Sequence, residues 1–172
     1  MGFDSPSKDR RSVLSMQAMQ FDRLYPQPNG LRVLLVEDNA LSRKLLKAMM
    51  LKTGAVVDTA NNGRRALEKF SPGRYQLVFM DVNMPHVNGL EATRLMREQE
   101  LHMPDELPAC IVGVSSEPLA EACLAAGMNE FIAKPAQQDQ VQAVIACYHR
   151  ARKAAQVEDK NLGLPAHNSL RN

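Results

Sequence analysis

Five residues that could take part in chemistry each stand directly after a short, mostly apolar segment of the sequence. They are Glu37, Asp38, Asp81, Ser115 and Lys134. Three of them are carboxylates, and carboxylates gathered at one place raise at least one pKa unless a cation lies among them. The candidate ligand atoms are all oxygens, which favours a hard cation such as Mg²⁺ over zinc or copper. Because Mg²⁺ often completes its shell with phosphate oxygens, the set suggests phosphoryl chemistry.

Asp81 is the best candidate for a nucleophile in this set. A carboxylate at the end of a buried strand can form an acyl phosphate. Lys134 would supply a positive charge for the incoming phosphoryl oxygens, and the Ser115 hydroxyl could donate a hydrogen bond to one of them. A phosphoryl group brings roughly 1.5 to 2 negative charges and three acceptor oxygens, enough to draw Ser115 and its loop inward. The set therefore predicts a phosphorylation switch.

Each of these residues also has an ordinary interpretation when it is taken alone. The acidic pair could begin a loop or cap a helix, and Ser115 with Ser116 could cap a helix that starts at Pro118. Lys134 could be an exposed loop lysine. The functional interpretation depends on the elements that would bring all five residues to one place.

The pattern of apolar residues predicts alternating strands and helices. Predicted strands lie at 31–36, 55–60, 77–80, 110–114 and 130–133. Predicted helices lie between Asn39 and Gly54 and at about 64–70, 90–100, 118–126 and 137–155. This alternation indicates an α/β fold, with a parallel sheet and helices on both of its faces. Ligands of such sheets bind beyond the carboxyl ends of the strands, which is where all five candidate residues fall.

Length and composition favour one folded domain. The chain has 172 residues, of which 45% are hydrophobic, enough to bury a sizeable core. We expect an N-terminal extension over 1–30, a main domain over 31–152 and a disordered C-terminal tail over 153–172. The middle of the extension could form a short amphipathic helix or belong to a disordered tail.

Charge, hydropathy and cysteine content exclude several other classes. The 21 Lys and Arg residues nearly balance the 19 Asp and Glu residues, so composition gives no case for nucleic-acid binding. No apolar stretch approaches the roughly 20 residues that would span a bilayer, and the N-terminus lacks a signal-peptide pattern, so we expect a cytoplasmic protein without a membrane partner. The three cysteines lie in apolar settings and are expected to be buried thiols.

Four stretches of the sequence resemble the receiver domains of response regulators in two-component and phosphorelay signalling. They are Val33-Leu34-Leu35-Val36-Glu37-Asp38-Asn39, Val78-Phe79-Met80-Asp81-Val82-Asn83-Met84-Pro85 with Asn88-Gly89, Val112-Gly113-Val114-Ser115-Ser116, and Phe131-Ile132-Ala133-Lys134-Pro135. The resemblance covers about 31–150, and four motifs in the family's order make it specific. It implies a flavodoxin-like (CheY-like), doubly wound sheet of five strands in the order 2-1-3-4-5.

The resemblance also implies a role for each residue of the candidate site. Implied are a phosphoacceptor at Asp81, an acid pair at Glu37 and Asp38, a metal-binding backbone carbonyl at Asn83, a switch hydroxyl at Ser115, a phosphoryl-binding lysine at Lys134 and a switch aromatic at Phe131. The implied metal is Mg²⁺ or Mn²⁺. The aromatic residue could equally be a core side chain on a strand.

The sequence departs from the family pattern at two places, and one of its loops resembles a subgroup of the family. Glu37 replaces the common Asp of the first acid position, so it could reach the metal through water. Ser116 stands where Ala or Gly is common, and its hydroxyl could alter access of phosphodonors or of the hydrolytic water. The loop from Glu100 to Pro108 resembles those of receivers in hybrid histidine kinases, which makes a histidine-phosphotransfer protein a plausible donor.

The leading hypothesis is a phosphoacceptor switch with self-catalysed phosphorylation and dephosphorylation, and not an enzyme acting on other molecules. Its donor would be a histidine kinase or a histidine-phosphotransfer protein, and a downstream protein would bind the face of the fourth helix, fifth strand and last helix. The short stretch after Lys134 favours a stand-alone receiver, with a fragment of a hybrid histidine kinase as the alternative. A metal-dependent phosphohydrolase would need a second Asp where this sequence has Asn83. The sequence leaves the oligomeric state open.

Overall fold

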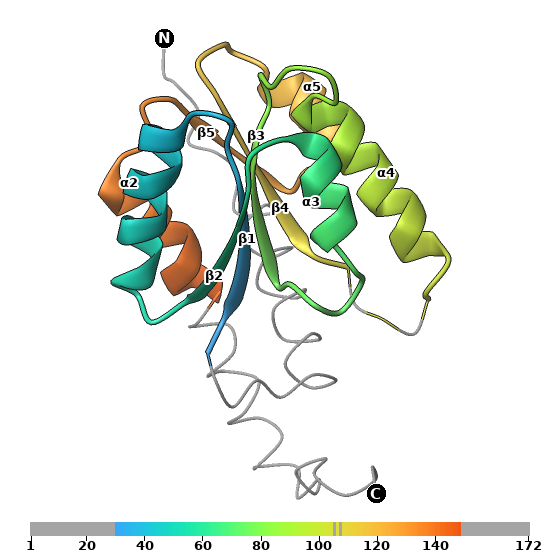
Figure 1. Ribbon diagram of the computed structural model, residues 1–172, viewed down its shortest axis with the longest axis horizontal. Coiled ribbons are helices and arrows are strands. Elements are labelled where there is room, and N and C mark those ends of the chain that lie inside the picture. The colour runs from blue at the N-terminus through green and yellow to red at the C-terminus, as the bar shows by residue number, and fades with distance from the viewer. Residues whose placement is uncertain (1–29, 105, 107, 149–172) are drawn as a thin grey trace, which may run out of the picture.

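The computed structural model describes residues 30–148, apart from residues 105 and 107. Its elements form one parallel sheet flanked by helices (Figure 1). The strands are β1 (Arg32–Val36), β2 (Val56–Ala60), β3 (Leu77–Asp81), β4 (Cys110–Ser115) and β5 (Glu130–Ala133). The helices are α2 (Ala40–Leu51), α3 (Gly63–Lys69), α4 (Gly89–Leu101), α5 (Ala120–Ala125) and a last helix described over residues 138–148. The predicted extension, the C-terminal tail and the predicted end of the last helix lie outside the described residues.

The sheet has the strand order β2-β1-β3-β4-β5, and every neighbouring pair is parallel. This is the predicted order 2-1-3-4-5, and the fold prediction is confirmed. The central strands β3 and β4 are buried at every residue, because helices cover both of their faces. The edge strand β2 includes Asp58 and Thr59 and is less buried.

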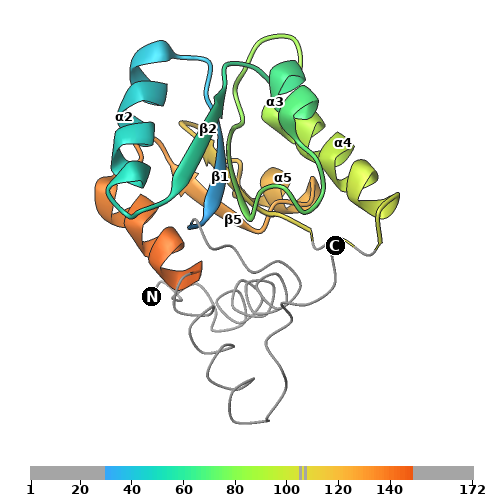
Figure 2. The same ribbon diagram turned by 60° about the horizontal axis from the view of Figure 1, so that its bottom comes forward.

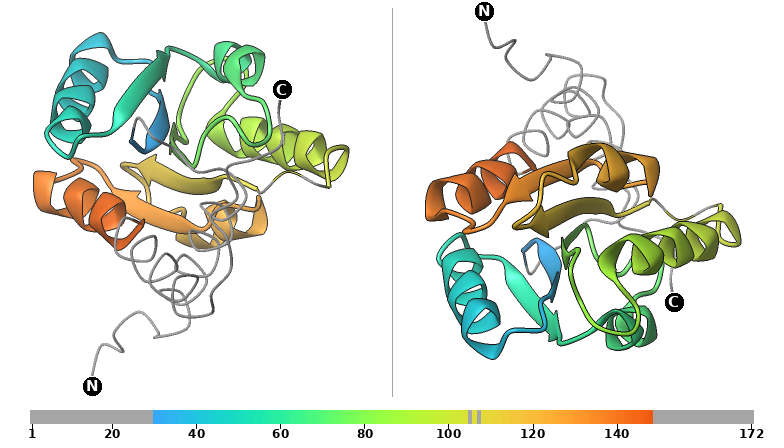
Figure 3. Two further views of the ribbon diagram at one scale, coloured as in Figure 1. Left: turned by 90° about the horizontal axis from the view of Figure 1, so that it is seen from below. Right: turned by 90° about the horizontal axis from the view of Figure 1, so that it is seen from above.

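Two apolar cores lie on the two faces of the sheet. Helix α2 and the last helix cover one face, which they reach through residues such as Leu46 and Ile145. Helices α3, α4 and α5 cover the other face, where Phe70, Met96 and Cys123 are buried. Figure 3 shows the two groups of helices on opposite sides of the strands. Apart from its two edge strands, the sheet therefore meets solvent at the two ends of its strands, and every loop that follows a strand begins at the same end, the carboxyl edge.

Asparagine side chains begin three of the helices at this carboxyl edge. Asn39, Asn62 and Asn88 each accept hydrogen bonds from backbone N–H groups in the first turn of the helix that follows. Such caps hold the strand-to-helix loops in fixed conformations. Among the described residues, no helix is long and apolar enough to cross a bilayer.

The start of α5 differs from the prediction. The helix begins at Ala120 and not at Pro118, and its N-cap residue, Leu119, makes no side-chain hydrogen bond to the first turn. The reason is a turn that precedes the helix, in which the Ser115 hydroxyl accepts a hydrogen bond from the Glu117 N–H at 3.0 Å. In the residues that follow, the Leu119 N–H donates to the Glu117 carbonyl at 2.8 Å, which makes residues 117–119 a tighter turn than a helix.

Side-chain networks of paired charges lie at the amino edge of the sheet, where the strands begin. On α4, Arg97 donates to Glu100 Oε2 at 2.6 Å, to the Ala109 carbonyl at 3.0 Å, to the Gly127 carbonyl at 2.9 Å and to Asn129 Oδ1 at 2.9 Å. These contacts join α4 to the chain just before β4 and β5. Arg97 thus holds together segments that are distant in sequence.

A second network at this edge centres on Tyr75, which is buried. Its hydroxyl donates to Asp58 Oδ2 at 2.9 Å, and Arg32 and Arg74 lie 3.5 and 3.8 Å from the same oxygen. Both guanidinium groups also lie over the Tyr75 ring, at 5.9 and 5.2 Å from its centroid. Burial and the hydrogen bond to Asp58 raise the pKa of Tyr75 to about 12.

The cysteines are free thiols, as predicted. Cys110 and Cys123 are buried, while Cys147 is half-buried. Burial raises the pKa of Cys110 to about 12, so this thiol is protonated and unreactive at neutral pH.

Candidate functional site

The three predicted carboxylates meet at the carboxyl edge of the sheet. Glu37 and Asp38 follow β1, and Asp81 is the last residue of β3, the neighbouring strand. One oxygen atom from each carboxylate lies within 4.8 Å of the others. Glu37 and Asp81 are buried, whereas Asp38 is exposed. The structure therefore forms one acidic cluster from residues that are 44 positions apart at most.

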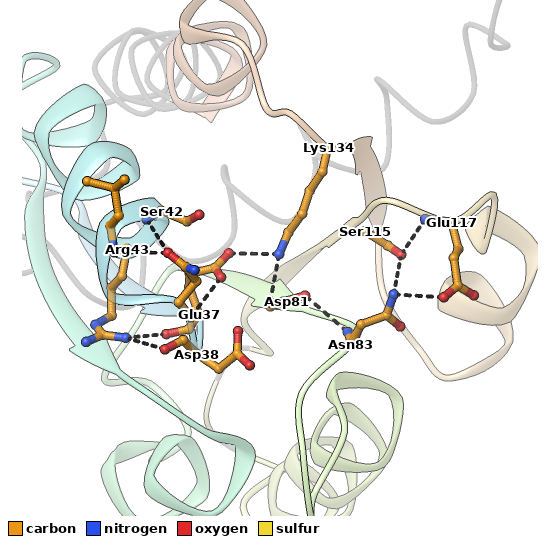
Figure 4. A network of polar contacts seen from close by, with 11 residues as sticks. Glu37, Asp38, Ser42, Arg43, Asp81, Asn83, Ser115, Glu117 and Lys134 are labelled. Carbon is orange, nitrogen blue, oxygen red and sulfur yellow. Dashed lines mark hydrogen bonds and ion pairs between the residues drawn. The ribbon is translucent and has the colours of Figure 1, made fainter.

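Lys134 supplies the positive charge of this cluster from the end of β5. Its Nζ donates a hydrogen bond to Asp81 Oδ2 at 2.7 Å and forms an ion pair with Glu37 Oε2 at 2.9 Å (Figure 4). The second carboxylate oxygens are bound by backbone groups: Glu37 Oε1 accepts from the Asn39 N–H at 3.2 Å, and Asp81 Oδ1 accepts from the Asn83 N–H at 3.1 Å. Both buried carboxylates are therefore held in fixed orientations.

One ammonium group does not fully neutralise the cluster. Burial, assisted by the charge of Asp81, raises the pKa of Glu37 above its ordinary value even though Lys134 opposes this shift. Burial also disfavours the charge of Lys134, but its hydrogen bond with Asp81 and the neighbouring Glu37 outweigh that effect and raise its pKa. Negative charge is therefore in excess at this edge, and an added cation would be stabilised there.

Ser115 lies beside the acidic cluster at the end of β4, where it is fully buried. Its Oγ accepts from the Glu117 N–H and from Asn83 Nδ2, the latter at 3.4 Å. Asn83 Nδ2 also donates to Glu117 Oε1 at 3.2 Å, which closes a small network (Figure 4). The Ser115 carbonyl accepts from the Lys134 N–H at 2.7 Å, so the serine and lysine loops are joined directly.

The two remaining candidate residues lie at different depths. Phe131, on β5, is half-buried and packs against the apolar core beneath α3, α4 and α5. Ser116 is exposed and lines a cleft of about 350 Å³ that opens between α2 and residues 134–136. Glu37 and Lys134 line the same cleft, so it reaches the acidic cluster.

Two residues of the site were missing from the sequence prediction. Arg43 Nη1, on α2, donates to the Glu37 carbonyl at 2.7 Å and to the Asp38 carbonyl at 3.1 Å, which fixes the loop that carries the acid pair. Glu117 binds Asn83 as described above. The helical spacing between Asn39 and Arg43 could have indicated the first contact, because it places the arginine over the helix start. Sequence offers no comparable signal for Glu117.

The chemistry of the acidic cluster fits a divalent cation. Its ligand atoms are all carboxylate oxygens, they lie close enough to share one ion, and the three carboxylates face one ammonium group, that of Lys134. Glu37, Asp38 and Asp81 would hold the ion, which would neutralise charge on an incoming phosphoryl group. The same arrangement without an ion would keep two buried carboxylates at the expense of stability.

Fold and site together define a receiver of the kind found in two-component signalling. A family model for the response regulator receiver domain matches residues 33–146. The chain belongs to the response regulator receiver domain family.

Curated relatives of the chain are hybrid histidine kinases and related sensor kinases. It is 40% identical over 107 residues to hybrid signal transduction histidine kinase F of Dictyostelium discoideum. The matched region covers 60% of this chain and 10% of the relative. It is 35% identical over 138 residues to the autoinducer 2 sensor kinase/phosphatase LuxQ of Vibrio parahaemolyticus, covering 78% of this chain and 16% of the relative. The chain thus spans a small part of the length of these relatives.

Solved receiver domains have the same fold. The receiver domain of the sensor histidine kinase PA1611 of Pseudomonas aeruginosa, solved with a magnesium ion in its active-site cleft, is 30% identical with a TM-score of 0.58, covering 69% of this chain and 97% of that one. The receiver domain of Ssk1 of Saccharomyces cerevisiae, solved with the histidine phosphotransfer protein Ypd1, is 25% identical with a TM-score of 0.65, covering 69% and 88%.

Proposed function

We propose that this chain accepts a phosphoryl group on Asp81 from a phosphohistidine and signals through a conformational change that a partner protein recognises. The observation that carries the proposal is the position of Lys134 Nζ, which contacts both Asp81 and Glu37 at the mouth of a cleft. A buried nucleophilic carboxylate next to a lysine and two further acids is the arrangement that phosphoryl transfer needs.

Transfer would form a bond between one Asp81 oxygen and phosphorus while the bond between phosphorus and the donor histidine nitrogen breaks. The carboxylate is oriented for attack, because its two oxygens are held by Lys134 and by the Asn83 N–H. Lys134 would then exchange its contact with Asp81 for one with the phosphoryl oxygens. A Mg²⁺ or Mn²⁺ ion on Glu37, Asp38, Asp81 and the Asn83 carbonyl would neutralise the phosphoryl charge when bound.

Ser115 would be the residue that responds to phosphorylation of Asp81. In the structure the Ser115 oxygen accepts two hydrogen bonds, one from the backbone and one from the Asn83 side chain. A phosphoryl oxygen on Asp81 requires a donor, so the hydroxyl must turn toward it and pull residues 115–117 along. Phe131 lies on the strand paired with β4, and its side chain would fill the space that the loop vacates. Ser116, at the cleft, would influence access of donors and water.

The proposal extends to the arrangement of the whole chain. Residues 31–152 would form the receiver, with an extension over 1–30 and a tail over 153–172. The curated relatives favour one variant of this arrangement, in which the sequence is the receiver of a hybrid histidine kinase, because the chain matches 10% to 16% of the first relatives' length. In both arrangements a histidine kinase or a histidine-phosphotransfer protein is the donor.

The test is phosphorylation by acetyl phosphate in the presence of Mg²⁺, measured by intact-protein mass spectrometry. The chain should gain the mass of one phosphoryl group, and EDTA should prevent the gain. The Asp81→Asn variant should gain none, while the matched Asp58→Asn variant at the amino edge should behave as the wild type. Labelling that persists in the Asp81→Asn protein would overturn the proposal.

A further inference from the structure

One residue of α2, Arg43, holds the backbone of the loop that carries the acid pair. Its Nη1 donates to the Glu37 carbonyl at 2.7 Å and to the Asp38 carbonyl at 3.1 Å, and its backbone N–H donates to the Asn39 carbonyl at 2.9 Å. Consecutive carbonyl groups of the loop are therefore bound by the same residue. Figure 2 shows this short connection between the end of β1 and the first turn of α2.

The three carboxylates of the acidic cluster differ in what orients them. Those of Glu37 and Asp81 are each held by Lys134 on one oxygen and by a backbone N–H on the other. Within residues 30–148, leaving aside 105 and 107, no hydrogen bond or ion pair reaches the carboxylate of the exposed Asp38. The position of this carboxylate therefore depends on the backbone of residue 38, which Arg43 binds.

Arg43 brings a positive charge to the acid pair without occupying a carboxylate oxygen. Its Nη1 is bound to carbonyl oxygens, whereas Lys134 Nζ is bound to carboxylate oxygens of Glu37 and Asp81. Figure 4 shows Arg43 and Lys134 on opposite sides of the acid pair. A cation on the cluster would thus compete with Lys134 for ligand atoms, while the contacts of Arg43 would remain.

A firmly held ligand matters most for a small ion. Mg²⁺ requires near-ideal octahedral geometry at short distances, whereas Ca²⁺ accepts more ligands at longer and more variable distances. A carboxylate on a fixed backbone therefore favours Mg²⁺, and a carboxylate on a mobile loop adapts more easily to Ca²⁺. Loss of a residue that orients a metal ligand typically weakens binding by roughly 10- to 100-fold.

We propose that Arg43 is a positioning residue for the metal site, because it holds the Asp38 carboxylate in place for a small divalent cation and so favours Mg²⁺ over Ca²⁺. The inference rests on the proposed function, in which Glu37, Asp38 and Asp81 hold the ion, and it adds the residue that makes the site selective. The alternative is that Arg43 acts through its charge alone. A nearby positive charge repels a divalent cation, so the alternative predicts tighter binding of both ions when that charge is removed.

The test is a titration of the full chain with MgCl₂ and, separately, with CaCl₂, followed by NMR shifts of backbone amides. Arg43→Met keeps an unbranched side chain and removes the charge and the donors. Its dissociation constant for Mg²⁺ should rise by about tenfold, and that for Ca²⁺ by a smaller factor. Lys44→Met is the matched control, because it removes one positive charge from the next position of α2, where the exposed Lys44 binds no group of the described chain. This control should not weaken the binding of either ion.

A second measurement needs no metal. In EDTA, amide hydrogen exchange at Asn39, whose N–H donates to Glu37 Oε1, should accelerate in Arg43→Met because the loop is no longer held. The Lys44→Met protein should exchange this amide at the wild-type rate. Arg43→Lys keeps the charge on a shorter side chain, so it should bind Mg²⁺ more weakly than the wild type and more tightly than Arg43→Met.

The outcomes separate this inference from the proposed function, which labelling by acetyl phosphate decides. Absence of any Mg²⁺-dependent shift at residues 37, 38 and 81 of the wild type would overturn the metal site and the inference with it. Normal Mg²⁺ binding by the wild type, combined with unchanged or tighter binding by Arg43→Met, would overturn the positioning role alone. So would equal losses of affinity for Mg²⁺ and Ca²⁺. If circular dichroism shows that Arg43→Met does not fold, Arg43→Lys decides by the same criteria.

Discussion

At the carboxyl edge of the sheet, one ammonium group lies among three carboxylates, whereas at the amino edge arginines outnumber or match the acids they contact. Lys134 faces Glu37 and Asp81 with Asp38 close by, and the pKa of Glu37 is raised. Arg97 meets Glu100 and three neutral oxygens. The first arrangement carries more negative than positive charge, whereas in the second each acid faces at least one guanidinium group.

This difference separates two uses of buried polar groups. A network in which every polar group has a partner stabilises a fold, whereas a network with excess negative charge can bind a cation. Substitutions at the amino edge should therefore lower stability and leave phosphorylation intact, and substitutions at the carboxyl edge should do the opposite.

The largest effect is expected for Lys134→Ala. Loss of the only ammonium group of the site should slow labelling by acetyl phosphate by about 100-fold, because a preorganised charge at the reacting oxygens is removed. Mass spectrometry over a time course measures the rate. Lys69→Ala is a control, since Lys69 binds the Thr59 carbonyl from an exposed position. A rate within a few-fold of the wild type would contradict the role of Lys134.

The next effect is expected at the opposite edge. Arg97→Ala removes hydrogen bonds to four groups and leaves the buried Glu100 without its charged partner, so the free energy of unfolding should fall by about 3 kcal/mol. Urea denaturation followed by circular dichroism measures this quantity. Arg64→Ala should cost less than about 0.5 kcal/mol, because the Arg64–Glu68 pair is 84% and 61% exposed. If Arg97→Ala abolished labelling while the protein stayed folded, the division between the two edges would be wrong.

A smaller effect, with an unusual sign, is expected for Glu37→Gln. The pKa of Glu37 is higher in the folded protein than in the unfolded chain, so its contribution to stability is present below about pH 4.5 and is lost as the pH rises through the folded value. At pH 7 with EDTA, the neutral side chain should therefore raise the free energy of unfolding slightly, while Lys134 keeps its contact with Asp81.

Magnesium should reverse the order of stability of the wild type and the Glu37→Gln variant. The ion should stabilise the wild type by about 1.4 kcal/mol at ten times its dissociation constant, and the Glu37→Gln variant by less at the same concentration. Thermal melts with and without MgCl₂ compare the two proteins, with the exposed Glu68→Gln as control. A variant less stable than the wild type in EDTA would show that the carboxyl edge is not in excess of negative charge.

A small effect is also expected for Tyr75→Phe, which removes one hydrogen bond to Asp58 and should cost about 1 kcal/mol at neutral pH. The pKa of Tyr75 is about 12 in the folded protein and lower in the unfolded chain. The stability of the wild type should therefore fall as the pH rises from about 10 to 12. The Tyr75→Phe variant should lose this part of the pH dependence. Identical stability–pH profiles of the two proteins, measured by urea denaturation, would show that Tyr75 does not cause it.

The sequence was sufficient to predict the sheet because each strand is a short apolar run of its own. The run before Asp81, for example, is buried at every residue, as its composition indicated. The site could be predicted for the same reason, since parallel strands bring their carboxyl ends to one edge. The predictions for Glu37, Asp81, Ser115 and Lys134 therefore depended on topology and not on side-chain contacts.

Features that depend on individual side-chain contacts could not be predicted. Arg97 meets Gly127 and Asn129, which are 30 and 32 positions away, and no local pattern marks the pairing. The start of α5 was predicted from Pro118, but the Ser115–Glu117 turn outcompetes the helix there. Helix propensity is a weak guide wherever a local side-chain hydrogen bond offers the backbone another conformation.

Gly89 occupies a position next to the candidate site where no larger residue fits. It opens α4 against β3, and a Cβ atom at this position would overlap the carbonyl oxygen of Asp81 and lie 2.8 Å from Val82 Cα. Any side chain would therefore displace the backbone that carries the Asp81 carboxylate. In a saturation screen that selects for signalling, position 89 should be as intolerant as the acidic residues, although it contributes no functional group. A residue without any functional group thus limits which substitutions are tolerated next to Asp81, because only its small volume fits there.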